Sequence, residues 1–259
     1  MNRHHDPELE DHDRGLSFDM PKLISRRRVL GLMAGGVTTA ALAACGSSGT
    51  TGTAEIPDET AGPYPGDGSN GPNALTESGI VRSDITTSFG DASGVADGVP
   101  TAIEMTLLDV ASEGAPLAGA AVYVWHCDIE GRYSMYDQGV AGENYLRGVQ
   151  ESDGKGKVAF ASIFPAAYAG RWPHIHFEVY ESLDAATSGG SKLKTSQIAL
   201  PEDTCELVYA TEAYAQSAER LAETSLDGDM VFADGYAGQL ATASGTVDGG
   251  LTIRLNVGV

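Results

Sequence analysis

Two histidines, His174 and His176, have the spacing in this sequence that most directly suggests chemistry. They lie in the segment PHIHFEVY, where polar and apolar residues alternate as they do in a β-strand. Because successive side chains of a strand point to opposite faces, both imidazoles project from one face, and Ile175 and Phe177 project from the other. Two neighbouring imidazoles on a rigid strand are a candidate half of a metal site. A purely structural pair of histidines is the alternative.

The spacing of the two histidines does not identify the other ligands of such a site. Glu178 shares the face of the histidines and would complete a site of two histidines and one carboxylate. Four residues of extended strand place Glu178 about 13 Å from His174, which is too far for one small ion unless the strand bends. Tyr168 precedes His174 by six residues, across a loop that contains Gly170, so its phenol is a second candidate ligand.

The pattern along the rest of the chain predicts the elements that must position these residues. Alternation of apolar residues predicts strands at 101–110, 121–127, 157–163, 194–200 and 251–257. Helical spacing predicts a short helix at 211–224, while the polar segment 137–150 is expected to be a loop and 153–156 a hairpin turn. Together these elements predict a mainly β protein, an antiparallel β-sandwich with long loops and a short helix toward the C-terminus.

The first 44 residues have the layout of an export signal. Consecutive arginines after Ser25, which resemble a twin-arginine signal, precede an apolar run at 31–44 of about two-thirds the length that spans a bilayer. The run ends in LAAC, which resembles a lipoprotein cleavage site. We therefore expect residues 1–44 to be removed, Cys45 to carry a lipid that anchors the protein to a membrane, and residues 45–59 to form a flexible tether. An ordinary signal cleaved nearby is the alternative.

Residues 60–259 remain as one domain that is long enough to bury a sizeable core. The chain has 36 acidic and 16 basic residues, for a formal net charge of −20. Such a chain lacks the basic stripe that neutralises phosphates, so no nucleic-acid partner is expected. Beyond the predicted signal, Cys127 and Cys205 would form a disulfide in an exported protein or remain as two buried free thiols.

Three motifs together resemble the intradiol ring-cleavage dioxygenases, the family of the catechol 1,2-dioxygenases and protocatechuate 3,4-dioxygenases. The motifs are WHCDIEGRYS at 125–134, FPAAY at 164–168 and RWPHIHF at 171–177. The resemblance implies a non-haem Fe(III) ion held by Tyr133, Tyr168, His174 and His176.

The resemblance also implies an activity. A catechol-type substrate and O2 would react so that the ring opens between the two hydroxylated carbons, giving a cis,cis-muconate-type diacid. Arg171 would stabilise charge that develops on the substrate, because a fixed guanidinium suits that task. Tyr168 would leave the metal and take a proton, and Gln197 would lie near the pocket in which oxygen reacts. His126 matches a position that is not a ligand, so structural hydrogen bonding is expected there.

The sequence departs from the soluble enzymes of this family in two places. The interval between Tyr168 and His174 is shorter, so we expect a more open site, and residues 1–59 contain no counterpart of a helical dimerisation domain. The chain therefore resembles the exported members of the family, and we expect it outside the cytoplasm, held at the cell membrane by a lipid. Two alternative functions are a non-catalytic surface β-sandwich that binds ligands and an Fe(II) oxygenase that uses Glu178. Trp172 and Tyr64 would either shape the pocket or serve as ordinary packing residues.

Overall fold

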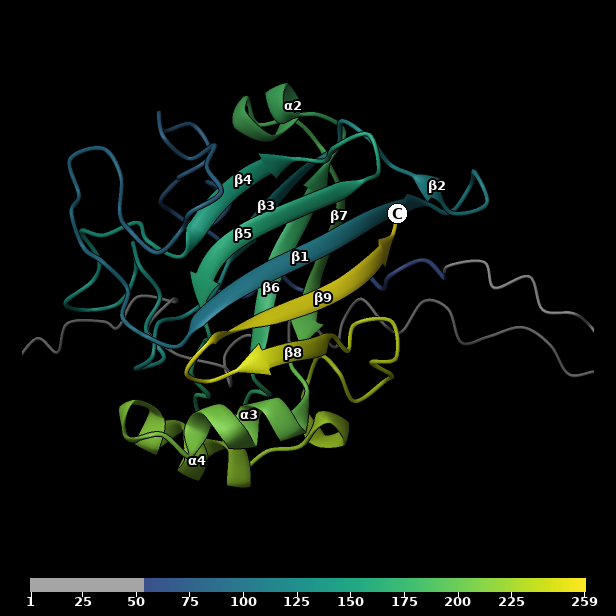
Figure 1. Ribbon diagram of the computed structural model, residues 1–259. Coiled ribbons are helices and arrows are strands. Elements are labelled where there is room, and N and C mark those ends of the chain that lie inside the picture. The colour runs from purple at the N-terminus through teal and green to yellow at the C-terminus, as the bar shows by residue number, and fades with distance from the viewer. Residues whose placement is uncertain (1–53) are drawn as a thin grey trace, which may run out of the picture. The chain divides into compact units, whose positions relative to one another are not determined.

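Two β-sheets stacked on each other form the body of the protein, as the computed structural model shows (Figure 1). The structure describes residues 54–259, so the predicted signal, Cys45 and most of the predicted tether lie outside the described residues. One sheet has the order β2-β1-β9-β8, with β5 also paired to β1, and the other has the order β4-β3-β6-β7. The prediction of a mainly β sandwich is confirmed.

The elements have the following bounds. The larger sheet consists of β1 (Pro100–Asp109), β2 (Ala115–Pro116), β5 (Lys157–Ile163), β8 (Thr242–Thr246) and β9 (Gly250–Gly258). The smaller sheet consists of β3 (Ala121–Trp125), β4 (Arg147–Glu151), β6 (His174–Tyr180) and β7 (Lys192–Ala199). The helices are α2 (Leu183–Thr187), α3 (Glu202–Tyr209) and α4 (Ala215–Ala222), with the 3-10 turns η3 (Glu212–Tyr214) and η4 (Leu226–Gly228).

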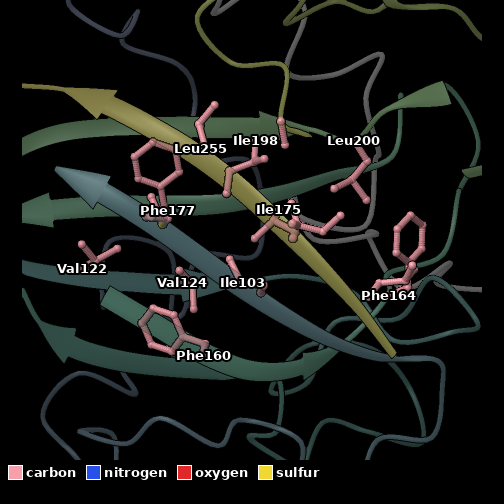
Figure 2. Packing of buried hydrophobic residues seen from close by; sticks show 14 of the residues in the cluster. Ile103, Val122, Val124, Phe160, Phe164, Ile175, Phe177, Ile198, Leu200 and Leu255 are labelled. Carbon is pink, nitrogen blue, oxygen red and sulfur yellow. The ribbon is translucent and has the colours of Figure 1, made fainter. Parts of the chain in front are cut away.

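Apolar side chains fill the space between the sheets (Figure 2). Ile175 and Phe177 of β6 point into this core together with Val122 and Val124 of β3 and Ile103 of β1. Burial of each such side chain contributes about 1.5–3 kcal/mol. The alternation predicted for β6 therefore decides the fold and the site together, because burying its apolar face directs His174 and His176 to the opposite face.

One strand pair differs from the antiparallel prediction. Strand β9 runs parallel to β1, in a register that aligns Thr101 with Leu251 and Leu108 with Gly258. The other neighbour of β9 is β8, which pairs with it in antiparallel fashion. The strand predicted at 251–257 therefore lies inside its sheet, because β8 and not β9 occupies the edge.

Two local predictions in the middle of the chain were wrong. Strand β4 lies partly within the predicted loop 137–150. A Cβ atom on Gly148 would lie 2.5 Å from Cγ2 of Ile85, so this glycine allows a close approach of two chain segments and does not mark a loop. Residues 153–156 do form a tight turn, but it joins β4 to β5, which belong to different sheets, and so it is not a hairpin.

The helical content is also larger than predicted. The segment 211–224 contains η3 followed by α4, while α2 and α3 were not predicted. None of the helices formed by residues 54–259 is long and apolar enough to cross a membrane. The packed domain also extends into the predicted tether, because Ile56 is only 2% exposed and its N–H donates to the carbonyl of Gly258 at 3.0 Å.

Candidate metal centre and active site

The outer face of the four-stranded sheet positions the candidate site. On this face His176 of β6 is the register partner of Trp125 on β3 and of Gln197 on β7. His174 lies two residues earlier on the same face of β6, so the sheet itself brings both histidines to one place. The segment after β3 supplies Tyr133, and the segment before β6 supplies Tyr168.

The four donor atoms that the sequence predicted as metal ligands converge. The phenol oxygens of Tyr133 and Tyr168 are 3.2 Å apart, and the Tyr168 oxygen is 3.1 Å from Nε2 of His174. Nε2 of His174 is in turn 3.0 Å from Nε2 of His176. Two oxygens and two nitrogens from separate segments of the chain thus meet at one point, which is the arrangement that a bound cation requires.

Burial controls the protonation of these four groups. It raises the pKa of Tyr133 well above its ordinary value and raises that of Tyr168 as well, where the charge of Arg171 opposes the shift. Burial, followed by the charge of Arg171, lowers the pKa of His174 and His176 well below the ordinary value. The imidazoles are therefore held in the neutral form that binds metals, and the phenols need a strongly charged cation to replace their protons.

The two histidines are oriented by different means. Nδ1 of His174 donates to the carbonyl of Trp172 at 2.5 Å, which leaves Nε2 with its lone pair toward the donor cluster. The buried Nδ1 of His176 has no hydrogen-bond partner within residues 54–259. Its ring is instead stacked on the indole of Trp125, with ring centroids 4.9 Å apart and an angle of 6° between the planes.

This donor set fits a ferric ion. Phenolate oxygens are hard and anionic, and imidazole nitrogens are common iron ligands. Residues 54–259 contain no group of three histidine, cysteine, aspartate or glutamate side chains that could hold a metal, so a metal at this place must use the tyrosines. The residues that would hold it are Tyr133, Tyr168, His174 and His176.

The two other predicted site residues lie beside the donors. Arg171 is 4% exposed, and its Nη1 is 3.4 Å from Nε2 of His174. Its Nη2 donates to Oε1 of Gln197 at 2.6 Å. The amide of Gln197 donates in turn to the carbonyl of Thr60 at 2.9 Å, so it links the arginine to the loop that covers this face. The structure therefore brings Arg171 and Gln197 together beside the four donors.

Two residues of the site were not predicted. Asp229 is fully buried, and its carboxylate accepts a hydrogen bond from Nε of Arg171 at 2.9 Å. Gly62 has φ +73°, and a Cβ there would lie 3.3 Å from Cε1 of His176. No motif surrounds Asp229, whereas Gly62 lies in the turn at 60–65, which also carries Tyr64. The ring of Tyr64 lies 5.1 Å from that of Tyr133, so this turn does pack against the site.

Glu178 is directed away from the histidine nitrogens. One carboxylate oxygen accepts from Nζ of Lys192 at 2.6 Å, and the other accepts from the hydroxyl of Tyr180 at 2.6 Å. The strand remains extended along this stretch, so Glu178 stays remote from His174, as the spacing suggested. The alternative site of two histidines and one carboxylate is therefore not formed.

The remaining candidates have structural roles. Nδ1 of His126 is 2.8 Å from the carbonyl of Cys127, and its Nε2 is 2.7 Å from Oγ of Ser162, which confirms the predicted hydrogen bonding. Cys127 and Cys205 are buried free thiols, so the disulfide alternative was wrong. The indole of Trp172 donates to the carbonyl of Leu200 at 2.9 Å and packs in a small apolar cluster, as expected of a packing residue.

Comparison with known proteins bears on this geometry. Residues 71–177 match a family model described as "Dioxygenase", and this range contains all four donors and Arg171 but neither Gln197 nor Asp229. A segment of 57 residues is 39% identical to Catechol 1,2-dioxygenase 2 of Acinetobacter lwoffii, covering 22% of this chain and 20% of that protein. A segment of 81 residues is 35% identical to Hydroxyquinol 1,2-dioxygenase of Corynebacterium glutamicum, covering 30% and 25%. The alignments thus span a fifth to a quarter of these relatives.

A solved structure matches over a larger part of the chain. The intradiol ring-cleavage dioxygenase from Tetranychus urticae superposes with a TM-score of 0.61 at 24% identity, covering 79% of this chain and 94% of that one. At this identity the similarity concerns the fold. The chain has the β-sandwich fold of the intradiol dioxygenases, with the candidate ligands inside the segment that matches the dioxygenase model.

Proposed function

We propose that this protein is a non-haem iron dioxygenase that cleaves the ring of catechol-type aromatics between the two hydroxylated carbons, using O2 and giving cis,cis-muconate-type diacids. The observation that carries the proposal is the convergence of two phenol oxygens and two imidazole nitrogens, each 3.0–3.2 Å from the next. The dioxygenase match and the shared fold support it. Ferric iron held by these donors would supply Lewis-acid chemistry that orients a catechol and promotes its reaction with O2.

The residues around the donors have separable tasks in such a reaction. Tyr133, His174 and His176 are buried, whereas Tyr168 is half-buried as a residue, so we assign its phenol oxygen as the donor that gives way to a substrate. That oxygen lies between the phenol of Tyr133 and the imidazole of His174, where it can receive a proton from a substrate hydroxyl.

Arg171 supplies a hydrogen-bond donor beside the same cluster, and Gln197 accepts from its Nη2 and so helps to hold it there. The guanidinium is nearly excluded from water, so its charge acts strongly on negative charge that develops on a substrate. The indole of Trp125 packs on the face of the His176 ring, and the turn at 60–65 lies against its Cε1 atom. Both limit the access of water to this imidazole.

Colour tests the iron site directly. Tyrosinate coordinated to ferric iron gives a visible charge-transfer band, so the iron-loaded protein should be burgundy. Tyr133→Phe should bleach or shift this band, because it removes one phenol oxygen. Glu178→Gln is the matched control, because its carboxylate is engaged by Lys192 and Tyr180 and not by the donors. A colourless protein with a full complement of iron would contradict the proposal.

Activity is tested by oxygen uptake with a panel of catechols, hydroxyquinol and carboxylated catechols. We expect one O2 consumed per ring opened and a muconate-type product that mass spectrometry identifies. Arg171→Gln should lower turnover while the visible band persists. A protein that binds iron and a catechol but consumes no O2 would instead be the non-catalytic binding module. The presence of all four donors with Arg171 beside them favours the enzyme.

We also propose that the protein is exported and anchored to the cell membrane by a lipid on Cys45. The support is the sequence alone: the arginines after Ser25, the apolar run at 31–44 and the LAAC box. Mass spectrometry of the mature N-terminus should find a lipid-modified cysteine. Cys45→Ala should release the protein from the membrane fraction. A mature chain that begins elsewhere and stays soluble in both forms would contradict this proposal.

A further inference from the structure

A segment near the C-terminus lies against the candidate site. After η4 the chain turns at Asp229 and then runs beside the edge strand β7. There the N–H of Ala199 donates to the carbonyl of Gln239 at 2.9 Å, and the N–H of Ala241 donates to the carbonyl of Ala199 at 3.0 Å. These hydrogen bonds fix the end of the segment 226–241 at the sheet edge that also carries Gln197. The segment lies beyond the residues that match the dioxygenase model.

The carboxylate of Asp229 is surrounded by hydrogen-bond donors. Oδ2 accepts from Nε of Arg171 at 2.9 Å and from the N–H of Trp172 at 2.7 Å. Oδ1 accepts from the N–H of Val231 at 2.8 Å, with the N–H of Phe232 at 3.3 Å and Nη2 of Arg171 at 3.4 Å. Together these backbone and guanidinium donors hold the fully buried carboxylate in a single orientation.

This carboxylate determines the direction in which the guanidinium of Arg171 points. Asp229 holds Nε, and Gln197 accepts from Nη2, so two edges of the planar group are fixed. The third nitrogen, Nη1, then faces the donor cluster at 3.4 Å from Nε2 of His174. A side chain held in this way loses no further rotamer freedom when charge develops near it, so its full electrostatic effect is available.

We propose that Asp229 is a positioning residue, a buried carboxylate that orients the guanidinium of Arg171 toward the reacting end of the bound aromatic substrate. The inference rests on the proposed function, because the task of Arg171 exists only if a substrate reacts at the donor cluster. It extends the functional site to Asp229, a residue far beyond the motifs that hold the donors.

The test compares Asp229→Asn with Asp227→Asn in the iron-loaded protein. Asp227 is exposed on η4, two residues away, and its substitution removes the same charge from the same segment without touching Arg171. For Asp229→Asn we expect kcat to fall by about 10- to 100-fold. The iron content, the visible band and the Kd for catechol measured without O2 should change by less than about threefold, because neither the ligands nor uniform binding is altered. Asp227→Asn should match the wild type.

A double-mutant cycle separates positioning from a merely structural role. If Asp229 acts through Arg171, the double variant Asp229→Asn with Arg171→Gln should be no slower than Arg171→Gln alone. If the fold-losses in kcat of the two single variants multiply in the double variant, the proposal is overturned. An Asp229→Asn protein whose kcat is within about twofold of the wild-type value would also overturn it.

A second variant covers the case in which Asp229→Asn does not fold. Asp229→Glu keeps the charge that the buried donors require but adds a methylene that displaces the guanidinium. It should fold, bind iron and lose at least about fivefold in kcat; wild-type kcat in this variant would overturn the proposal. An inactive wild-type protein would overturn the proposed function and this inference together, whereas an active wild type with an equally active Asp229→Glu variant would overturn this inference alone.

Discussion

The indole of Trp125 stacks on the imidazole of His176 with ring centroids 4.9 Å apart and planes within 6° of parallel. The two residues are register partners on β3 and β6, so the pairing of the strands creates the stack. His174 is oriented by a hydrogen bond, but His176 has no hydrogen bond at Nδ1 among residues 54–259. The orientation of His176 therefore depends on packing.

Trp125→Leu should weaken iron binding, because leucine fills space without providing a flat surface for the imidazole. We expect iron affinity to fall by about 10- to 100-fold, the range for loss of a group that orients a metal ligand. Trp125→Phe keeps an aromatic plane and should stay within about threefold of the wild type. Competition with an iron chelator measures both. Equal affinities for the two variants would show that the stack does not orient His176.

Gly62→Ala should disturb the site through two separable effects. The φ of +73° costs a residue with a Cβ about 1–2 kcal/mol of folding free energy. The added methyl would also lie 3.3 Å from Cε1 of His176 and press on that ring. We expect lower stability together with weaker iron binding, measured by thermal unfolding and chelator competition.

Gly90→Ala is the matched control for Gly62→Ala. Gly90 has φ +68°, and a Cβ there would meet nothing within 4 Å. It should lose the same stability and keep normal iron affinity. If both variants bind iron equally well, the contact between Gly62 and His176 has no functional effect.

Arg147→Met should destabilise the loops that carry the site. The buried guanidinium donates to the carbonyls of Pro65 at 2.9 Å, Tyr64 at 3.0 Å and Ser134 at 2.8 Å. It thereby ties the turn at 60–65 to the segment that holds Tyr133. Removing it leaves buried carbonyls without donors, so we expect a loss of about 3 kcal/mol or more in the free energy of unfolding, measured by denaturant titration.

Arg220→Met serves as the control for this experiment. Arg220 is paired with Glu223 at the surface, and both side chains are about half exposed or more. Its removal should change the free energy of unfolding by less than about 0.5 kcal/mol. A similar effect of the two substitutions would contradict the role assigned to Arg147.

Acid should destabilise the protein through His126. Burial lowers the pKa of this histidine to about 4, whereas the unfolded chain has the ordinary value of 6.5. Between these two pH values the unfolded state binds a proton that the folded state does not, so stability falls as the pH drops from 6.5 to 4. The total loss from this group is about 3 kcal/mol.

His126→Gln should flatten this pH dependence. In the same metal state, the slope of unfolding free energy against pH should be smaller than in the wild type by about 1.4 kcal/mol per pH unit, which corresponds to one proton. Denaturant titrations at several pH values measure the difference. Parallel curves for the two proteins would mean that His126 is not the group that titrates.

Much of the site could be predicted from sequence because its chemistry is local. The alternation around His174 and His176 places both imidazoles on one face whatever the rest of the fold, since the period of a strand is two residues. The spacing also indicated correctly that Glu178 is too far from His174 to share a metal ion with it, because an extended strand separates the two residues. Tyr133, Tyr168 and Arg171 were found because they lie within short motifs that resemble a known family.

The features that could not be predicted depend on contacts between distant segments. Asp229, Gly62 and Arg147 act on residues far from them in the sequence, and periodicity and motifs carry no information about such partners. Gly148 illustrates the same limit: its polar, glycine-containing surroundings predict a loop, whereas it lies in a strand where Ile85 leaves no room for a Cβ. Local pattern is enough to say which face of the strand presents the two histidines, and motif resemblance is enough to name the candidate ligands. Folding decided what orients those side chains, because orientation comes from packing and hydrogen bonds that exist only once the two sheets and their loops have come together.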